Sequence, residues 1–237
     1  MMNRTITTII FDLDNTLFNF NDYWESAHHE TFNQFKYDSL FQIDYDDFID
    51  KYRYFDKLLW EELLKKRVEL DELRIKRLIY TLNHFGIEID REHASKFFNT
   101  FFQLLLKGIQ PNYQLIEKLK NLKKKYTVCI LTNGKSDEQL EKIKRCKFYD
   151  LLPYYISDDI GYEKPDEEAF WFVLNKLGST PSETLMVGDS VTNDIFPAAK
   201  LGLQTCYIGK EHSNGADYAF KNIEEAIDEF IGKEVIR

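Results

Sequence analysis

Hydrophobic and polar residues follow two different patterns along the chain. The apolar run Ile9-Ile10-Phe11 lies within a strand predicted over residues 6–11, and its lack of polar positions is typical of a strand buried on both faces. From Asp22 to Leu106 the apolar residues instead recur every three to four positions, which predicts amphipathic helices and no strand. Gly86 and Gly108 are placed to end two of these helices.

The second half of the chain alternates between strand and helix patterns. Strands are predicted at Thr127–Thr132, Tyr154–Ser157, Thr184–Gly188 and Gln204–Ile208. Helices are predicted at Asn112–Lys125, Asp137–Arg145, Glu167–Leu177, Ile195–Leu201 and Ile223–Ile231. This alternation predicts an α/β fold, a doubly wound parallel sheet with helices on both faces. We expect a core formed by residues 1–17 and 109–237, with an inserted helical domain at 18–108.

Composition narrows the classes of function. The formal charge of −9 argues against a surface that coats a nucleic-acid polymer, because phosphate backbones demand clustered cations. No apolar stretch reaches 18 residues, so no membrane span is expected, and the N-terminal segment does not resemble a cleavable signal. The three cysteines have no CxxC spacing, which favours a reducing compartment. We therefore expect a cytoplasmic protein.

The first predicted strand ends in two acidic residues, Asp12 and Asp14. Residues i and i+2 of a strand point to the same face. Two carboxylates about 4 Å apart repel by roughly 4 kcal/mol at an effective dielectric near 20. Such crowding indicates a compensating partner, most simply a divalent cation.

Three further polar motifs follow later predicted strands, where ligands bind in open α/β sheets. They are Thr132-Asn133-Gly134, Glu163-Lys164-Pro165 and the segment from Gly188-Asp189 to Asp194. Each motif by itself has an ordinary structural explanation, such as a turn, a surface lysine before a helix or a helix cap. Their occurrence in order at successive strand ends favours a catalytic site.

Together these motifs resemble the haloacid dehalogenase-like (HAD) hydrolase superfamily. Its pattern is DxDx[TV], then a strand-end Ser or Thr, a Lys, and an acidic pair of the GDxxxxD type, and all four are present here. The position of the insert matches the family's helical C1 cap. The segments FDLDNTLFNF, ILTNG, GYEKPD and VGDSVTNDI, with the Leu59-Trp60 pair, are similar to small bacterial pyrimidine 5′-nucleotidases.

The resemblance implies a Mg²⁺-dependent phosphatase that forms an aspartyl-phosphate. Asp12 would be the nucleophile, and Asp14 the general acid and then the general base. Lys164 would neutralise charge on the transferring group, and Thr132, Asn133 and Gly134 would hold phosphate oxygens. The implied metal ligands are Asp12, Asp189 and the backbone carbonyl of Asp14, with Asp194 orienting a metal-bound water or Lys164.

The same resemblance separates reaction classes. Haloacid dehalogenases lack the second aspartate of the first motif, because a halide needs no proton to leave; Asp14 therefore favours phosphoryl chemistry. Thr16 is more common in phosphatases, whereas phosphosugar mutases often carry valine at that position. A mutase and a catalytically silent phosphate-binding protein remain the alternatives.

Substrate choice is expected to come from the cap. Phe18, Asn21, Trp24 and Trp60 are candidates for contacting a nucleobase, since bases stack on aromatic faces, although such rings equally serve to pack a cap core. The expected substrate is a small phosphorylated metabolite, with nucleoside 5′-monophosphates first and phosphoglycolate or sugar phosphates second. We expect a monomer or a homodimer with no nucleic-acid or membrane partner.

Overall fold

The computed structural model describes residues 5–209 and 215–231. Its contacts divide the chain into two compact units. The first lies within Met1–Phe20 and Ile109–Arg237, and the second is Asn21–Gly108. Each unit has its own hydrophobic core.

The first unit is built on a parallel sheet, which confirms the predicted fold class. Its strands are β1 (Thr8–Phe11), β2 (Thr127–Thr132), β3 (Tyr154–Ile156), β4 (Thr184–Gly188), β5 (Gln204–Ile208) and β6 (Tyr218–Phe220). They lie in the order β3-β2-β1-β4-β5-β6, and each neighbouring pair is parallel. Because β1 has β2 on one side and β4 on the other, the connections leave it in opposite directions. Sheets with such a reversal bind ligands at the carboxyl ends of the strands, beside the point where the strand order reverses.

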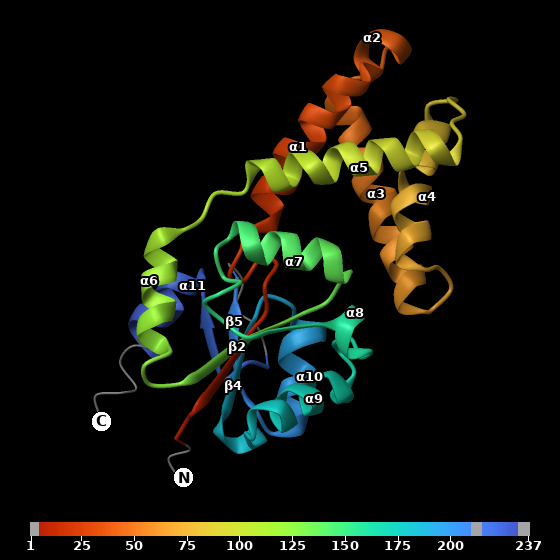
Figure 1. The fold of residues 1–237 in the computed structure, drawn as a ribbon. Helices are drawn as coiled ribbons and strands as arrows, with labels where there is room; N and C mark the ends of the chain where they lie inside the picture. The colour runs from red at the N-terminus through yellow and green to blue at the C-terminus, as the bar shows by residue number, and fades with distance from the viewer. Residues whose placement is uncertain (1–4, 210–214, 232–237) are drawn as a thin grey trace. The chain divides into compact units, whose positions relative to one another are not determined.

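Helices cover both faces of the sheet (Figure 1). Helices α9 (Glu167–Leu177) and α10 (Phe196–Leu201) pack on one face, and α6 (Tyr113–Leu122) and α11 (Ile223–Glu225) lie on the other. Phe170, Val173 and Leu174 of α9 join Ile10 and Met186 of the sheet in one buried cluster. Apolar strands with no polar positions thus bury both of their faces, as their sequence predicts.

The remaining elements of this unit are short. They are α7 (Ser136–Arg145), α8 (Ser157–Ile160), a 3-10 turn at Pro181–Glu183 and π-helical turns at Val191–Ile195 and Ala226–Ile231. The predicted strands and helices agree with the structure within a few residues, but the sequence analysis missed β6. This strand has three residues at the edge of the sheet and shows no run of buried apolar positions, which explains the omission.

The second unit is helical, with no strand within residues 21–108. Its helices are α1 (Phe20–Phe35), α2 (Tyr37–Phe41), α3 (Tyr45–Leu64), α4 (Leu70–His84) and α5 (Arg91–Gly108), of which α1 begins one residue before the unit. Asp44 caps α3 by accepting a hydrogen bond from the amide of Asp46 at 2.8 Å. Gly86 follows α4 at a positive φ of 76°, a backbone conformation that glycine adopts without strain.

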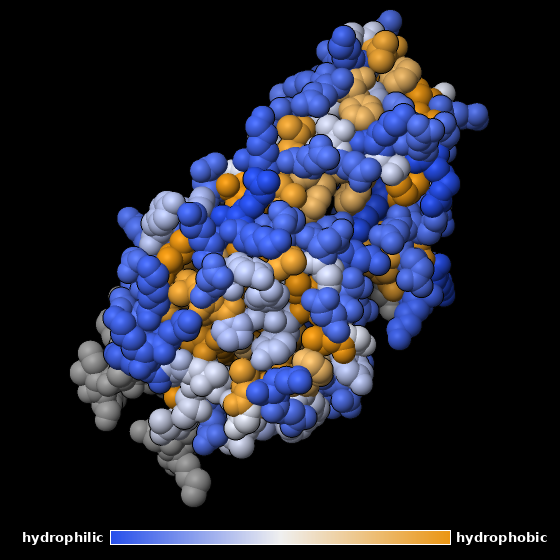
Figure 2. Space-filling model, in the orientation of Figure 1, coloured by the Kyte–Doolittle hydropathy of each residue, from blue (hydrophilic) through white to orange (hydrophobic). Residues whose placement is uncertain are grey.

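Aromatic side chains form the core of the helical unit. Phe32, Tyr37, Phe48, Tyr52 and Phe97 are each at most 1% exposed and pack in one cluster. On the face shown in Figure 2, hydrophilic residues surround small groups of apolar ones. Among the described helices, none is long and apolar enough to cross a membrane.

Candidate active site

Asp12 lies directly after β1, at the carboxyl edge of the sheet. Its backbone amide donates to the carbonyl of Val187 in β4 at 2.9 Å, which extends the pairing of these two strands beyond Phe11. The carboxylate is buried, and its Oδ1 atom accepts a hydrogen bond from Nζ of Lys164 at 2.7 Å. Strand pairing and the Lys164 ammonium therefore fix the position of this side chain at the carboxyl edge of the sheet.

Lys164 is buried between two carboxylates. Its Nζ donates to Asp12 Oδ1 at 2.7 Å and to Asp194 Oδ1 at 2.6 Å. The side chain of Asn133 holds its backbone from both sides, because Asn133 Nδ2 donates to the Lys164 carbonyl at 2.6 Å and Asn133 Oδ1 accepts from the Lys164 amide at 2.9 Å. Asn133, which follows Thr132 in the second motif, thereby positions Lys164 of the third motif, 31 residues later in the chain.

The acidic residues after β4 face Asp12. Ligand oxygens of Asp12, Asp189 and Asp194 all lie within 4.8 Å of one another. Asp194 is fixed by the amide of Ser190, which donates to its Oδ2 atom at 3.1 Å. A Cβ atom at Gly188 would lie 2.6 Å from Cβ of Asp194, so the close approach of this side chain requires glycine at that position.

Electrostatics in this cluster favours the binding of a cation. Burial, together with the charges of Asp194 and Asp189, raises the pKa of Asp12 to about 8 despite the nearby Lys164 ammonium. Burial and the charge of Asp194 likewise raise the pKa of Asp189 to about 6. Lys164 pairs with two of the three carboxylates, and hard oxygen donors of this kind are what Mg²⁺ prefers. The donor set therefore fits a divalent cation. Asp12 and Asp189 are the available side chains, because both oxygens of Asp194 already accept hydrogen bonds, from Lys164 and from the amide of Ser190.

The carboxylate of Asp14 has a different set of partners. Both of its oxygens accept from Nζ of Lys142, at 2.7 and 2.8 Å, and Oδ2 also accepts from Nε2 of Gln139 at 3.0 Å. Lys142 and Gln139 are buried residues of α7. Asp12 and Asp14 are thus each paired with a separate lysine.

The second motif lies beside this site. Thr132 is the last residue of β2 and is buried. The side chain of Asn133 is occupied by Lys164, and the amide of Gly134 donates to Oγ of Ser157 at 3.0 Å. Binding of phosphate oxygens by Thr132 and these amides stays a prediction.

Sequence reasoning missed Lys142 and Gln139. They lie three residues apart on α7, a spacing that places both side chains on one face of a helix. The neighbouring apolar position Ile143 is also buried, so α7 turns this face toward the core. A lysine on the buried face of a helix that directly follows a strand-end motif is the signal that could have identified them.

The predicted substrate-contacting residues differ in their exposure. Phe18 is buried, Asn21 and Trp60 are exposed, and Trp24 packs in the helical unit against His28 and Tyr52, at ring-centroid distances of 3.9 and 6.2 Å. Their role in substrate choice stays a prediction, and the packing of Trp24 agrees with the alternative of a cap core.

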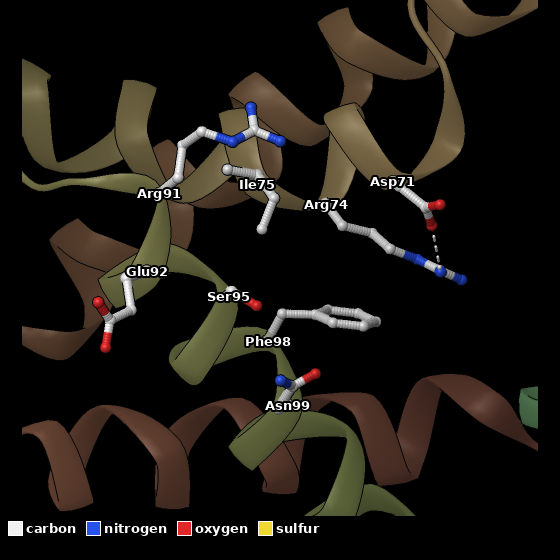
Figure 3. Close-up of a pocket in the computed structure, with 8 residues that line it drawn as sticks. All are labelled: Asp71, Arg74, Ile75, Arg91, Glu92, Ser95, Phe98 and Asn99. Carbon is white, nitrogen blue, oxygen red and sulfur yellow. Dashed lines mark hydrogen bonds and ion pairs between the residues drawn. The ribbon is translucent and has the colours of Figure 1, made fainter.

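The helical unit also contains a pocket of about 440 Å³ between α4 and α5 (Figure 3). Its lining includes Arg74, Arg91 and Phe98 but none of the predicted site residues. The guanidinium of Arg74 lies over the Phe98 ring and pairs with Asp71 at 3.1 Å, and Arg91 pairs with Glu72 at 2.6 Å. Because both guanidinium groups already have carboxylate partners, we assign the chemistry to the carboxyl edge of the sheet.

Known proteins resemble this chain over most of its length. It is 26% identical to the HAD-hydrolase YfnB of Bacillus subtilis over 213 residues, which are 86% of this chain and 84% of the relative. It is also 26% identical to the pyrimidine 5′-nucleotidase PynA of Streptococcus pneumoniae over 210 residues, 86% of this chain and 84% of that protein. The glyceraldehyde 3-phosphate phosphatase of Methanocaldococcus jannaschii is 26% identical over 231 residues, 94% of this chain and 96% of that protein.

A solved structure shares the fold. The crystal structure of B. subtilis YfnB bound to magnesium superimposes with a TM-score of 0.78 at 24% identity, covering 93% of this chain and 96% of YfnB. The sequence also matches the family described as haloacid dehalogenase-like hydrolase over residues 9–208. This match spans the first strand, all four motifs and the helical insert, and the protein therefore belongs to the haloacid dehalogenase-like hydrolase family.

Proposed function

We propose that the protein is a Mg²⁺-dependent phosphomonoester hydrolase that works through an aspartyl-phosphate on Asp12. The observation that carries this proposal is the convergence of the buried Asp12, Lys164 and Asp194 with the half-buried Asp189 at the carboxyl edge of β1 and β4. It combines a nucleophile on a rigid strand end, a buried cation and a set of oxygen donors for a metal. One relative that is named a phosphatase and one that is named a 5′-nucleotidase support the same reaction class.

In the first half-reaction a carboxylate oxygen of Asp12 attacks phosphorus, and the bond from phosphorus to the leaving oxygen breaks. Asp14 gives its proton to that oxygen, so the product leaves as an alcohol. In the second half-reaction a water attacks the phosphorus of the aspartyl-phosphate while Asp14 takes a proton from it. Phosphate is released and the carboxylate of Asp12 is restored.

The remaining residues stabilise charge and hold the reacting groups. Lys164, which is placed by Asn133 and Asp194, neutralises negative charge on the transferring phosphoryl group. Asp12, Asp189 and the Asp14 carbonyl would hold Mg²⁺, which would supply further charge neutralisation for the phosphoryl group. Thr132 and the backbone around Asn133 would contact the non-bridging oxygens, and the helical unit would act as the cap.

For the substrate we propose a nucleoside 5′-monophosphate first, because the motif segments and the Leu59-Trp60 pair resemble pyrimidine 5′-nucleotidases and PynA is a relative. A small phosphorylated sugar or carboxylic acid is the second candidate. The similarity to a glyceraldehyde 3-phosphate phosphatase over nearly the whole chain supports it.

Phosphate release tests both parts of the proposal. The purified full chain is incubated with nucleoside monophosphates, sugar phosphates, glyceraldehyde 3-phosphate and phosphoglycolate, with Mg²⁺ and separately with EDTA. Asp12→Asn is the matched catalytic control, because asparagine preserves the shape of the side chain but is no nucleophile. Metal-dependent turnover that prefers pyrimidine nucleotides and is absent in the variant is the expected result.

Other outcomes change specific parts of the proposal. Turnover concentrated on sugar phosphates or glyceraldehyde 3-phosphate keeps the mechanism and refutes the nucleotidase assignment. Transfer of the phosphoryl group to a second sugar would indicate a mutase. Absence of turnover and of phosphoenzyme with every substrate would refute the enzyme and favour a phosphate-binding protein.

A further inference from the structure

Lys142 is a buried lysine that the reaction described above does not use. It is 4% exposed, although it lies near the end of an amphipathic helix where a lysine could easily extend into solvent. Burial of an ammonium costs several kcal/mol unless it is paired and hydrogen-bonded. Here the pairing partner is Asp14, with both carboxylate oxygens at 2.7–2.8 Å from Nζ.

Gln139 and Phe20 support the contact between Lys142 and Asp14. The Nε2 atom of Gln139 bridges Asp14 Oδ2 at 3.0 Å and the carbonyl of Asn133 at 2.6 Å, which connects Asp14 to the second motif. On its other side, the Lys142 ammonium lies 4.8 Å from the ring centroid of Phe20, within the range of a cation–π interaction. The position of the Asp14 carboxyl is therefore determined by α7 as well as by its own loop.

We propose that Lys142, supported by Gln139, is a positioning residue that orients Asp14 for proton transfer to the leaving group. This inference rests on the proposed function, because it concerns the group that serves as acid and base in that reaction. An ammonium donates to the carbonyl oxygen of a protonated carboxyl as well as to a carboxylate, so the contact orients Asp14 in both halves of the cycle. In the protonated form the ammonium contacts the carbonyl oxygen alone, and the other carboxyl oxygen, released from that contact, carries the proton.

This role differs from a merely structural one in its dependence on the leaving group. An alkyl phosphate must expel an alkoxide, which needs a proton, whereas p-nitrophenolate is stable enough to leave without one. The value of kcat/KM reports steps up to formation of the aspartyl-phosphate, and so isolates leaving-group departure from the later hydrolysis. Loss of positioning should therefore impair kcat/KM for alkyl phosphates far more than for p-nitrophenyl phosphate.

The test compares variants of the full chain in Mg²⁺ with both substrate types, using the best alkyl phosphate from the substrate panel. Lys142→Met removes the ammonium while keeping an unbranched side chain, and Lys142→Arg keeps a cation. Lys144→Met is the matched control, because Lys144 lies two residues later on α7, is 44% exposed and pairs with Glu141. Thermal unfolding and circular dichroism show whether each variant is folded.

We expect Lys142→Met to lower kcat/KM about 10- to 100-fold with the alkyl phosphate and far less with p-nitrophenyl phosphate. General acid catalysis contributes about 10²–10⁴-fold in total, and the loss of positioning should remove only a part of it. Lys142→Arg should recover part of the loss, and Lys144→Met should show none. In an Asp14→Asn background, Lys142→Met should have no further effect, because the carboxyl group that Lys142 orients is already absent.

Three results would overturn the inference. Equal losses with the two substrates would indicate a structural or substrate-binding role for Lys142. Additive losses in the double variant would show that it acts independently of Asp14. If Lys142→Met fails to fold, Gln139→Met and Lys142→Arg replace it. The inference is then refuted if both variants keep the wild-type ratio of kcat/KM between the alkyl phosphate and p-nitrophenyl phosphate. Failure of the proposed function is separate, since the wild-type chain would then turn over neither substrate.

Discussion

Replacing Asp189 by asparagine should stabilise the metal-free protein while it removes one of the proposed metal ligands. Burial and the neighbouring Asp194 raise the pKa of Asp189 from an ordinary 3.8 to about 6 in the folded state. Above pH 6 the folded chain must therefore keep a carboxylate that its surroundings disfavour. Each pH unit between the two pKa values corresponds to about 1.4 kcal/mol, so this cost reaches about 3 kcal/mol at pH 8.

The sign follows from proton binding. Between pH 3.8 and about 6 the folded state binds more protons at Asp189 than the unfolded state does, so stability falls as pH rises through this range. Asparagine removes the cost. The gain from Asp189→Asn should thus be about 3 kcal/mol at pH 8 and about 1 kcal/mol at pH 4.5. At about 2–4 °C per kcal/mol for a chain of this size, Tm in EDTA should rise by about 6–12 °C at pH 8.

Differential scanning calorimetry in EDTA at the two pH values measures this gain. Asp150→Asn, on an exposed residue, is the matched control and should leave Tm unchanged. Addition of Mg²⁺ should raise the Tm of the wild-type protein at pH 8 and have little effect on Asp189→Asn, because binding to the folded state alone is stabilising. A lower Tm for Asp189→Asn in EDTA at pH 8, or a gain independent of pH, would refute the electrostatic reasoning.

Three further predictions concern the same core. Lys164→Met should abolish turnover and lower stability in EDTA by about 3–5 kcal/mol, because it leaves two buried carboxylates without their cation; an unchanged Tm would contradict this. Gly188→Ala should destabilise the chain by about 1–3 kcal/mol and reduce kcat, since its Cβ displaces Asp194; wild-type activity would exclude the steric argument. The three cysteine thiols are buried, which raises their pKa values, so a thiol reagent should label them only after unfolding; rapid labelling of the native protein would count against this burial.

Local sequence patterns were sufficient to predict most strands and helices of the core. The apolar runs around Ile10 and Ile130 predict strands buried on both faces, and the three-to-four-residue period from Asp22 to Leu106 predicts helices; the structure has both. The motif residues Asp12, Lys164, Asp189 and Asp194 were also found from their places after successive strands. Parallel strands bring their carboxyl ends to one edge, so sequence order alone implied that these side chains converge.

Strand β6 and the π-helical turn that contains Asp194 were not apparent from sequence. Three residues at a sheet edge carry too little apolar periodicity to be recognised, and a widened helical turn depends on packing and not on local propensity. The π-helical turn matters for the site, because it brings the Asp194 carboxylate to the Lys164 ammonium.

The sequence by itself determined the fold class, the helical insert and the identity of the acidic groups, because these depend on periodicity and on short motifs. Only the tertiary structure decided how those groups are paired. Asn133 holds the backbone of Lys164, and Lys142 and Gln139 hold Asp14, although in each case the partners lie 31 to 128 residues apart. Such pairing arises when distant elements pack and bury charge together, and the need to compensate each buried charge then selects the partner.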